Sequence, residues 1–114
     1  MKINEVLNKE IKYDNGRYVG QVVNGLPEGK GIFYLNVGER YEGDFRNGKF
    51  EGKGIYYYND GDRYEGDWKN DKNEGKGIYY FKNGDREMGD WKDGKEIGKH
   101  VKLSKNGEVE TENY

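Results

Sequence analysis

The chain has 114 residues with 19 glycines, one proline and no cysteine, and its net charge is −2 although 37% of the residues are charged. Alanine is absent and leucine occurs four times, which excludes a helical bundle because the best apolar helix formers are missing. No apolar run of about 18 residues could span a membrane, and no secretory segment follows Met1. We therefore expect one soluble, cytoplasmic domain, with association to membranes or the cytoskeleton left open.

Leucine, isoleucine, valine and phenylalanine together number only 21, a low share that is typical of disordered chains. Disorder, however, usually accompanies high net charge and few aromatic residues. Here the net charge is close to zero and there are 11 tyrosines. We therefore expect a folded chain in which the many glycines have a structural role.

The glycines recur with a period of 23 residues. The repeating units span residues 18–40, 41–63, 64–86 and 87–109. Eighteen of the 19 glycines occupy positions 3, 8, 12, 14 and 21 of this unit, and only Gly16 lies outside it. Residues 1–17 are expected to form an N-terminal cap and partial repeat, and residues 110–114 a C-terminal tail. Such regular repetition is typical of repeat proteins.

Unit two contains Y-E-G-D-F-R-N-G, then E-G-K-G-I-Y-Y and N-D-G-D-R, and unit three keeps nearly the same pattern. This pattern resembles the MORN repeat (membrane occupation and recognition nexus) over residues 18 to about 109. The fourth unit departs from it, because Glu87 replaces the leading tyrosine, His100 replaces a glycine and Lys102 replaces an aromatic residue. We expect this degenerate unit to act as a terminal cap, which repeat arrays need.

Each unit holds two short runs of period-2 character separated by turn residues, which predicts a β-hairpin. In unit two the runs are Tyr41–Arg46 and Lys53–Tyr58, with Asn47-Gly48 in the turn between them. Successive hairpins predict an all-β fold: a single-layer, elongated antiparallel meander. At about 4.8 Å per strand, eight to ten strands would make a rod roughly 40–50 Å long.

The turn lengths predict a register in which Tyr41 faces Tyr58, Phe45 faces Gly54 and Tyr58 faces Tyr64. On this register the strand glycines lie beside large rings that can fold over them, a known stabilising arrangement in sheets. The opposite face would carry mixed charges that contribute little individually.

Both ends of the predicted sheet need protection from edge-to-edge pairing. Ile3, Val6, Leu7 and Ile11 have rough helical spacing, so the N-terminal segment could form a helix or an extra strand. Glutamates at 108, 110 and 112 alternate along the last strand and would blunt its edge, and residues 112–114 are expected to fray. Homo-oligomers through the sheet ends remain open.

A row of aromatic residues is expected to line one face of the sheet and to bind a protein partner, because exposed aromatic surface usually marks an interaction site. The row comprises Tyr18, Phe33, Tyr41, Phe45, Tyr56, Tyr64, Trp68, Tyr79 and Trp91. The MORN resemblance implies a tethering or assembly module, in some cases one that binds a partner helix along a groove. On this hypothesis Trp68→Ala would weaken partner binding without unfolding the array.

The alternative is a phospholipid-binding tether, which the family's name implies, and a regulatory fragment of a larger MORN-containing enzyme is also open. The basic residues that would meet anionic lipid are Lys30, Lys53, Lys76, Lys99, Arg40, Arg63 and Arg86. Acidic residues lie between them in the sequence and disfavour this alternative.

Catalysis is not expected, and neither is a metal or other cofactor. The chain has a single histidine, His100, with one serine and one threonine, so few nucleophile and base combinations exist. Its carboxylates fall in repeated positions, whereas a catalytic pair is singular and has perturbed pKa values. A sequence pI of about 5.5 disfavours nucleic-acid binding, which needs a basic surface.

Overall fold

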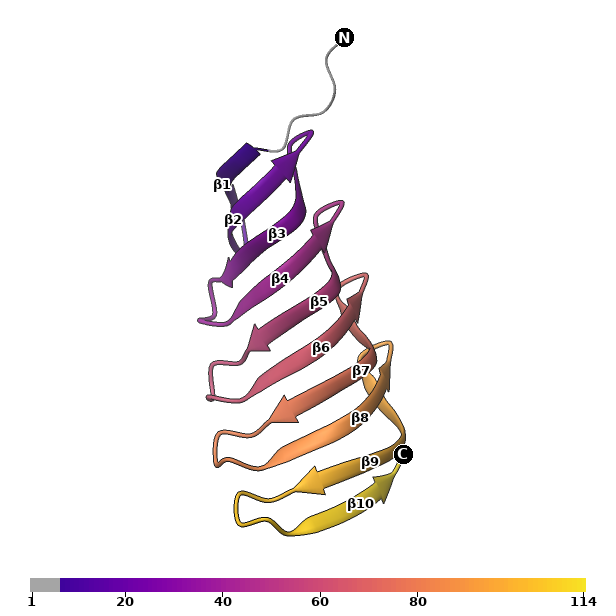
Figure 1. Cartoon of the computed structure of the whole chain (residues 1–114). Helices are drawn as coiled ribbons and strands as arrows, with labels where there is room; N and C mark the ends of the chain where they lie inside the picture. Colours follow the sequence, from indigo (N-terminus) through magenta and orange to yellow (C-terminus); the bar gives the residue numbers. More distant parts are fainter. Residues whose placement is uncertain (1–6) are drawn as a thin grey trace.

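The computed structural model describes residues 7–114 and shows one open sheet of ten antiparallel strands that follow each other in chain order (Figure 1). The strands are β1 (Leu7–Tyr13), β2 (Gly16–Val23), β3 (Leu26–Leu35), β4 (Arg40–Arg46), β5 (Lys49–Tyr57), β6 (Arg63–Lys69), β7 (Lys72–Tyr80), β8 (Arg86–Lys92), β9 (Lys95–Leu103) and β10 (Val109–Asn113). No helix in this part of the chain is long and apolar enough to cross a membrane.

The molecule is an elongated rod. Its extents are 57 × 27 × 21 Å and its radius of gyration is 16.1 Å, against about 13 Å for a compact domain of 100 residues. The predicted all-β meander of successive hairpins is therefore confirmed.

Tight turns join the two strands of each unit. Asn47 and Gly48 both have positive φ, 50° and 82°, as the two central residues of a type I′ turn require. The other three units turn at Asn24-Gly25, Asn70-Asp71 and Asp93-Gly94, again with positive φ at both residues. This turn brings the strands together directly, so that Arg46 pairs with Lys49.

The predicted register within the unit is wrong, by four residues next to the turn and by two beyond the bulge, because the second strand starts at Lys49 and not at Lys53. Tyr41 faces Tyr56 rather than Tyr58, and across the next connection it is again Tyr56 that faces Tyr64.

Phe45, in turn, faces Phe50 and not Gly54. Both differences, two residues at Tyr41 and four at Phe45, are even, and an even shift preserves the side of the sheet on which each residue lies. The two predicted faces therefore have the expected residues, although the cross-strand partners differ.

A bulge interrupts the pairing in each unit. Between the pairs Gly43–Gly54 and Phe45–Phe50, three residues of β5 stand opposite Asp44 alone, and the central one, Gly52, has φ 81°. Bulges bend the strand that contains them and increase its twist. The strands are correspondingly curved, and the single sheet curls toward one side along its length (Figure 1).

The enclosed side of the curl holds the core. Tyr41 is 0% exposed, and its ring lies directly on Gly54, where an added Cβ would come within 2.2 Å of the tyrosine hydroxyl oxygen. Its hydroxyl donates to the carbonyl of Asp44 at 2.9 Å. Trp68 of the following unit packs edge-on against the same ring, with centroids 5.2 Å apart. Each unit therefore depends on its successor to complete its core.

Strands also close both ends of the array. At the N-terminal end β1 is an extra strand that places Ile11 opposite Tyr18, while Ile3 and Val6 of the predicted cap lie outside the described residues. At the C-terminal end the expected fraying of residues 112–114 is wrong. β10 extends to Asn113, and the amide of Tyr114 donates to the carbonyl of Gly98 at 2.9 Å.

Because Trp68 is 6% exposed and seals the Tyr41 ring, we now expect Trp68→Ala to destabilise the array by about 3–5 kcal/mol. The matched control is Phe81→Ala, at a ring that is 39% exposed and should cost much less. Chemical denaturation followed by circular dichroism measures both. Equal stability of Trp68→Ala and the wild type would contradict this description of the core.

Candidate protein-binding face

The rings predicted to bind a partner divide into two layers. Six are buried and form the core itself: Tyr18, Tyr41, Phe45, Tyr64, Trp68 and Trp91. The other three, Phe33, Tyr56 and Tyr79, occupy one repeated position and are only partly buried against that core. Only this second layer offers surface to a partner.

The second layer contains further rings that the sequence analysis missed. Tyr58 lies 4.8 Å from Tyr56 and 5.7 Å from Tyr79, and Phe81 lies 4.8 Å from Tyr79 (ring centroids). Phe50 is also half-buried and stacks on Tyr41. The two-residue alternation of Tyr56 with Tyr58 already indicated a shared face, whereas Phe50 was hidden because its segment was taken as a loop.

Hydrogen bonds hold the exposed tyrosines in place. The hydroxyl of Tyr56 donates to Glu39 at 2.7 Å, and that of Tyr79 donates to Asp62 at 2.8 Å. Burial raises the pKa of both hydroxyls above the ordinary tyrosine value, and the carboxylate partners raise it further. The rings are therefore fixed neutral donors, which reduces the entropy lost when a partner covers them.

Two hollows lie along this surface. One has a volume of about 510 Å³ and is lined by Tyr13, Leu26, Phe33, Leu35 and Phe50 among others. The second, about 250 Å³, lies over units three and four between the rings of Tyr58, Tyr79 and Phe81 and the carboxylate of Glu96. The surface thus offers two separate recesses, a largely apolar one and one that combines aromatic rings with carboxylates.

The chemistry of the ring face changes along the rod. Position 10 of the unit holds Pro27, Phe50, Asn73 and Glu96 in units one to four. Residues at this position pair with the buried aromatic position of the preceding strand, as Phe50 does with Phe45 and Glu96 with Trp91. The face is therefore apolar toward β1 and acidic toward β10.

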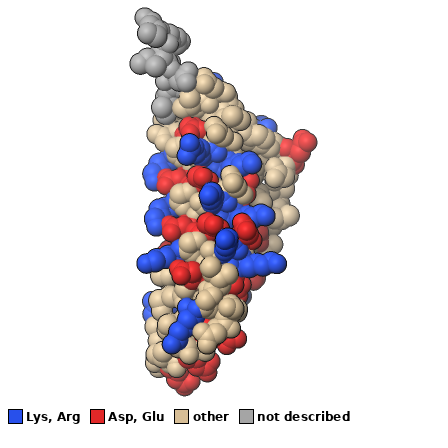
Figure 2. Space-filling view, turned by 90° about the vertical axis from the view of Figure 1, so that its right-hand side faces the viewer, with Lys and Arg blue, Asp and Glu red and all other residues tan. Residues whose placement is uncertain are grey.

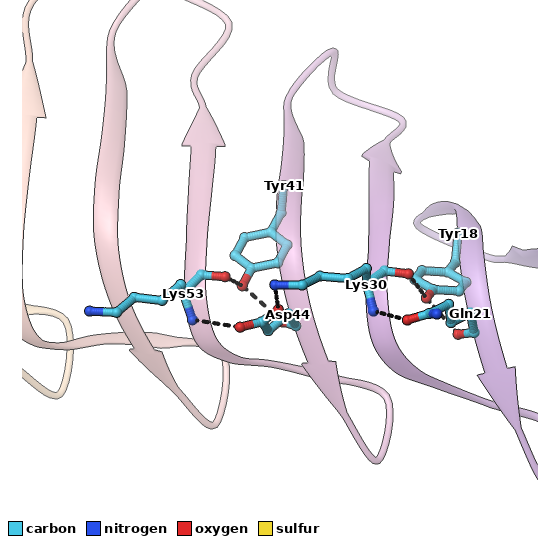
Figure 3. Close-up of polar contacts among 6 residues, drawn as sticks. All are labelled: Tyr18, Gln21, Lys30, Tyr41, Asp44 and Lys53. Atoms are coloured by element: carbon cyan, nitrogen blue, oxygen red, sulfur yellow. Dashed lines mark hydrogen bonds and ion pairs between the residues drawn. The ribbon is translucent and has the colours of Figure 1, made fainter. Parts of the chain in front are cut away.

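The opposite face carries the basic residues proposed for lipid binding, and many are paired. Lys30 forms an ion pair with Asp44 (Figure 3), and Lys53 forms one with Asp67. Although burial opposes ionisation, the bonds from the Lys30 side chain and the Lys53 amide lower the pKa of Asp44 below its usual value. Basic and acidic side chains consequently alternate along the rod (Figure 2).

The arginines of this face lie on tyrosine rings. The guanidinium groups of Arg40 and Arg63 are each 3.8 Å from a ring centroid, over Tyr57 and Tyr80 respectively. Arg40 also contacts Glu42 at 3.0 Å, and Arg63 contacts Glu65 at 3.5 Å. The remaining basic residues of the set, Lys76, Lys99 and Arg86, are exposed. An anionic lipid would have to compete with these carboxylates.

The fourth unit rebuilds the core with different residues. Glu87 stands at the tyrosine position and His100 at the glycine position, and the imidazole fills the space over Gly89, where a Cβ would meet the ring at 2.3 Å. Nε2 of His100 is 2.8 Å from the carbonyl oxygen of Asp90, the equivalent of the Asp44 carbonyl that Tyr41 binds. In unit four the core ring therefore comes from β9 and not from β8. The loss of the tyrosine at Glu87 is compensated by the gain of the imidazole at His100.

The curled hairpins stack on one another through aromatic rings that lie on strand glycines. This arrangement defines an open β-repeat array, in which each unit contacts only its neighbours. The chain belongs to the MORN repeat family, which it matches over residues 18–40, 41–63 and 64–86. The fourth unit lies outside the matched ranges. No curated protein matches the chain.

We predict strong coupling between Glu87 and His100. Glu87→Tyr alone would force a second ring into the space of the imidazole, at a cost of about 1–3 kcal/mol. His100→Gly alone would leave a cavity and a buried carboxylate, at a cost of about 3 kcal/mol. The double variant recreates the arrangement of units two and three. Its unfolding free energy should therefore exceed the value expected from adding the single losses, and simple additivity would contradict the exchange.

We also predict alkaline unfolding linked to the buried tyrosines. Burial raises the pKa of Tyr18 to about 12 and that of Tyr64 to about 12, whereas an unfolded tyrosine titrates near 10. Their contribution to stability is therefore complete below about pH 10 and is lost as the pH rises toward 12. Ultraviolet absorbance of tyrosinate, followed together with circular dichroism, measures this. Titration of every tyrosine near pH 10 in an intact fold would contradict it.

Proposed function

We propose that this protein is a non-catalytic scaffold that binds an amphipathic helix of a partner protein along its half-exposed aromatic layer. The observation that carries the proposal is this second layer of rings, Phe33, Phe50, Tyr56, Tyr58, Tyr79 and Phe81, which remains available after the core is complete. Membership of the MORN family supports a binding role, since such repeats often serve as binding modules.

The spacing of the rings suits a helix that lies along the rod. Equivalent rings recur once per unit, and two strands at about 4.8 Å each advance the sheet by roughly 10 Å. Seven residues of an α-helix rise about 10.5 Å at 1.5 Å per residue. Apolar side chains repeated every seven residues would therefore meet Phe33, Tyr56 and Tyr79 in succession.

The change in chemistry along the face gives the helix a direction. Its apolar anchors would occupy the hollow beside Phe33 and Phe50. Basic residues would lie over the end of the face where Glu96 is located. Complementary charge of this kind contributes more to orientation and association rate than to affinity.

We expect Phe81→Ala to weaken partner binding about tenfold or more, because truncated aromatic anchors commonly cost over 1 kcal/mol. The control is Tyr80→Ala, which removes the adjacent ring from the opposite face. Partners are recovered from native extract, identified by mass spectrometry and then measured by calorimetry against both variants. A partner that tolerates Phe81→Ala but is lost with Tyr80→Ala would contradict the assignment of the binding face.

A further inference from the structure

The last unit contains a cluster of titratable groups in which Glu87 and His100 are buried and Tyr114 is 48% exposed. His100 is 0% exposed and Glu87 is 6% exposed. The imidazole packs between Trp91 and Tyr114, with ring centroids 4.6 Å and 4.7 Å away. Ionisable side chains are rarely buried to this extent unless they have a partner of complementary chemistry.

Both nitrogens of the imidazole face oxygen atoms that accept hydrogen bonds. Nε2 is 2.8 Å from the carbonyl oxygen of Asp90, and Nδ1 is 2.8 Å from Oε2 of Glu87. The hydroxyl of Tyr114 donates to the same Oε2 at 2.7 Å. A neutral imidazole has only one N–H, so with Glu87 ionised it is the imidazolium that suits both neighbours. The Nδ1 contact is close but not aligned as a hydrogen bond, so charge attraction holds it.

The other ionisable groups near the ring come from every strand around it. From β10, Glu112 pairs in register with His100 and lies 4.0 Å from Lys102 of β9. The hydrogen bond to Glu87 raises the pKa of the Tyr114 hydroxyl, and the carboxylate of Glu96, from β9 itself, raises it further. From β7, Tyr79 stands opposite Glu87.

β10 pairs with β9, and the residue that follows it contacts this cluster. β10 is five residues long, every one of them is exposed, and it pairs with β9 alone. The side chain that follows it, Tyr114, contacts His100 and Glu87. It sits where Trp91 sits one unit earlier, at the same position of the 23-residue repeat. Tyr114 is therefore the anchor that fastens β10 to the core.

We propose that the protonation state of His100 controls the docking of β10, so that the C-terminal strand is a pH-dependent latch on the last unit. With the ring proton present, imidazolium, carboxylate and tyrosine hydroxyl attract one another. As the pH rises and the proton leaves, a lone pair of Nδ1 faces the carboxylate of Glu87 and the contact becomes repulsive. Tyr114 then detaches, β10 opens and the backbone edge of β9 becomes available for pairing.

The test is amide hydrogen exchange by NMR on the whole chain between pH 5.5 and 8.5. The reporter is the amide of Tyr114, which is bonded to Gly98, and the reference is an amide in the centre of the array. The opening constant of the Tyr114 amide is its measured exchange rate divided by its intrinsic exchange rate at each pH. We expect this constant to rise at least about tenfold with pH, because a buried charged group loses its partner. An opening constant that is flat or falls would overturn the proposal.

Two further measurements test the proposal, the first on the wild-type chain and the second on a double variant. His100 is the single histidine of the chain, so its imidazole ¹⁵N shifts need no assignment. Both nitrogens should be protonated while β10 is docked, and an unprotonated Nδ1 in the docked state would overturn the proposal. The Glu87→Tyr/His100→Gly double variant has no titrating pair and should show no pH dependence at Tyr114. Persistence of the wild-type pH dependence in that variant would also overturn it.

Discussion

The structure depends on a tyrosine ring that lies flat on a glycine. A single-layer sheet has no second layer against which to bury side chains, yet Tyr41 is completely buried. This is achieved because Gly54 has no Cβ to hold the ring away from the backbone and because the bulge at Gly52 curls the strand around it. Glycine, which ordinarily weakens a strand, is here the residue that permits a core.

The fourth unit shows which part of this arrangement is essential. Neither a tyrosine on one strand nor a glycine on the other is required, since Glu87 and His100 replace them. What persists is a ring that lies over a strand glycine and is bonded to the carbonyl of Asp90, the equivalent of Asp44. A second aromatic ring, which comes from the next repeat position, packs against it. The array therefore ends on a variation of its own packing. That variation places two ionisable side chains in the core, at positions where the preceding repeats have tyrosine and glycine.

Under the proposed function, stability and recognition belong to different layers of rings on the same face. The leading tyrosines are covered by the following unit and cannot touch a partner. The outer rings contribute less to the core and are free to vary, as the change from Phe50 through Asn73 to Glu96 shows. A regular scaffold can in this way present an irregular surface, which a specific interaction requires.

The sequence alone determined the repeating unit, the hairpin within it and the face on which each residue lies. The 23-residue period aligns glycines, turns and rings, and the two-residue alternation of a strand then sorts the faces. It did not determine the register, because the bulge opposite Asp44 leaves no distinct mark in the pattern and the segment from Lys49 resembles a loop.

Only the tertiary structure decided which rings are buried and what the ends do. Burial of Tyr41 rather than Tyr56 follows from the curl of the sheet, and neither hydrophobicity nor spacing distinguishes the two. In the sequence, Tyr114 is marked only by its position 23 residues after Trp91, because residues 110–113 do not repeat the Y-E-G-D pattern. Its contacts with His100 and Glu87 join the residue after β10 to β9 and β8, and such contacts exist only once the chain has folded.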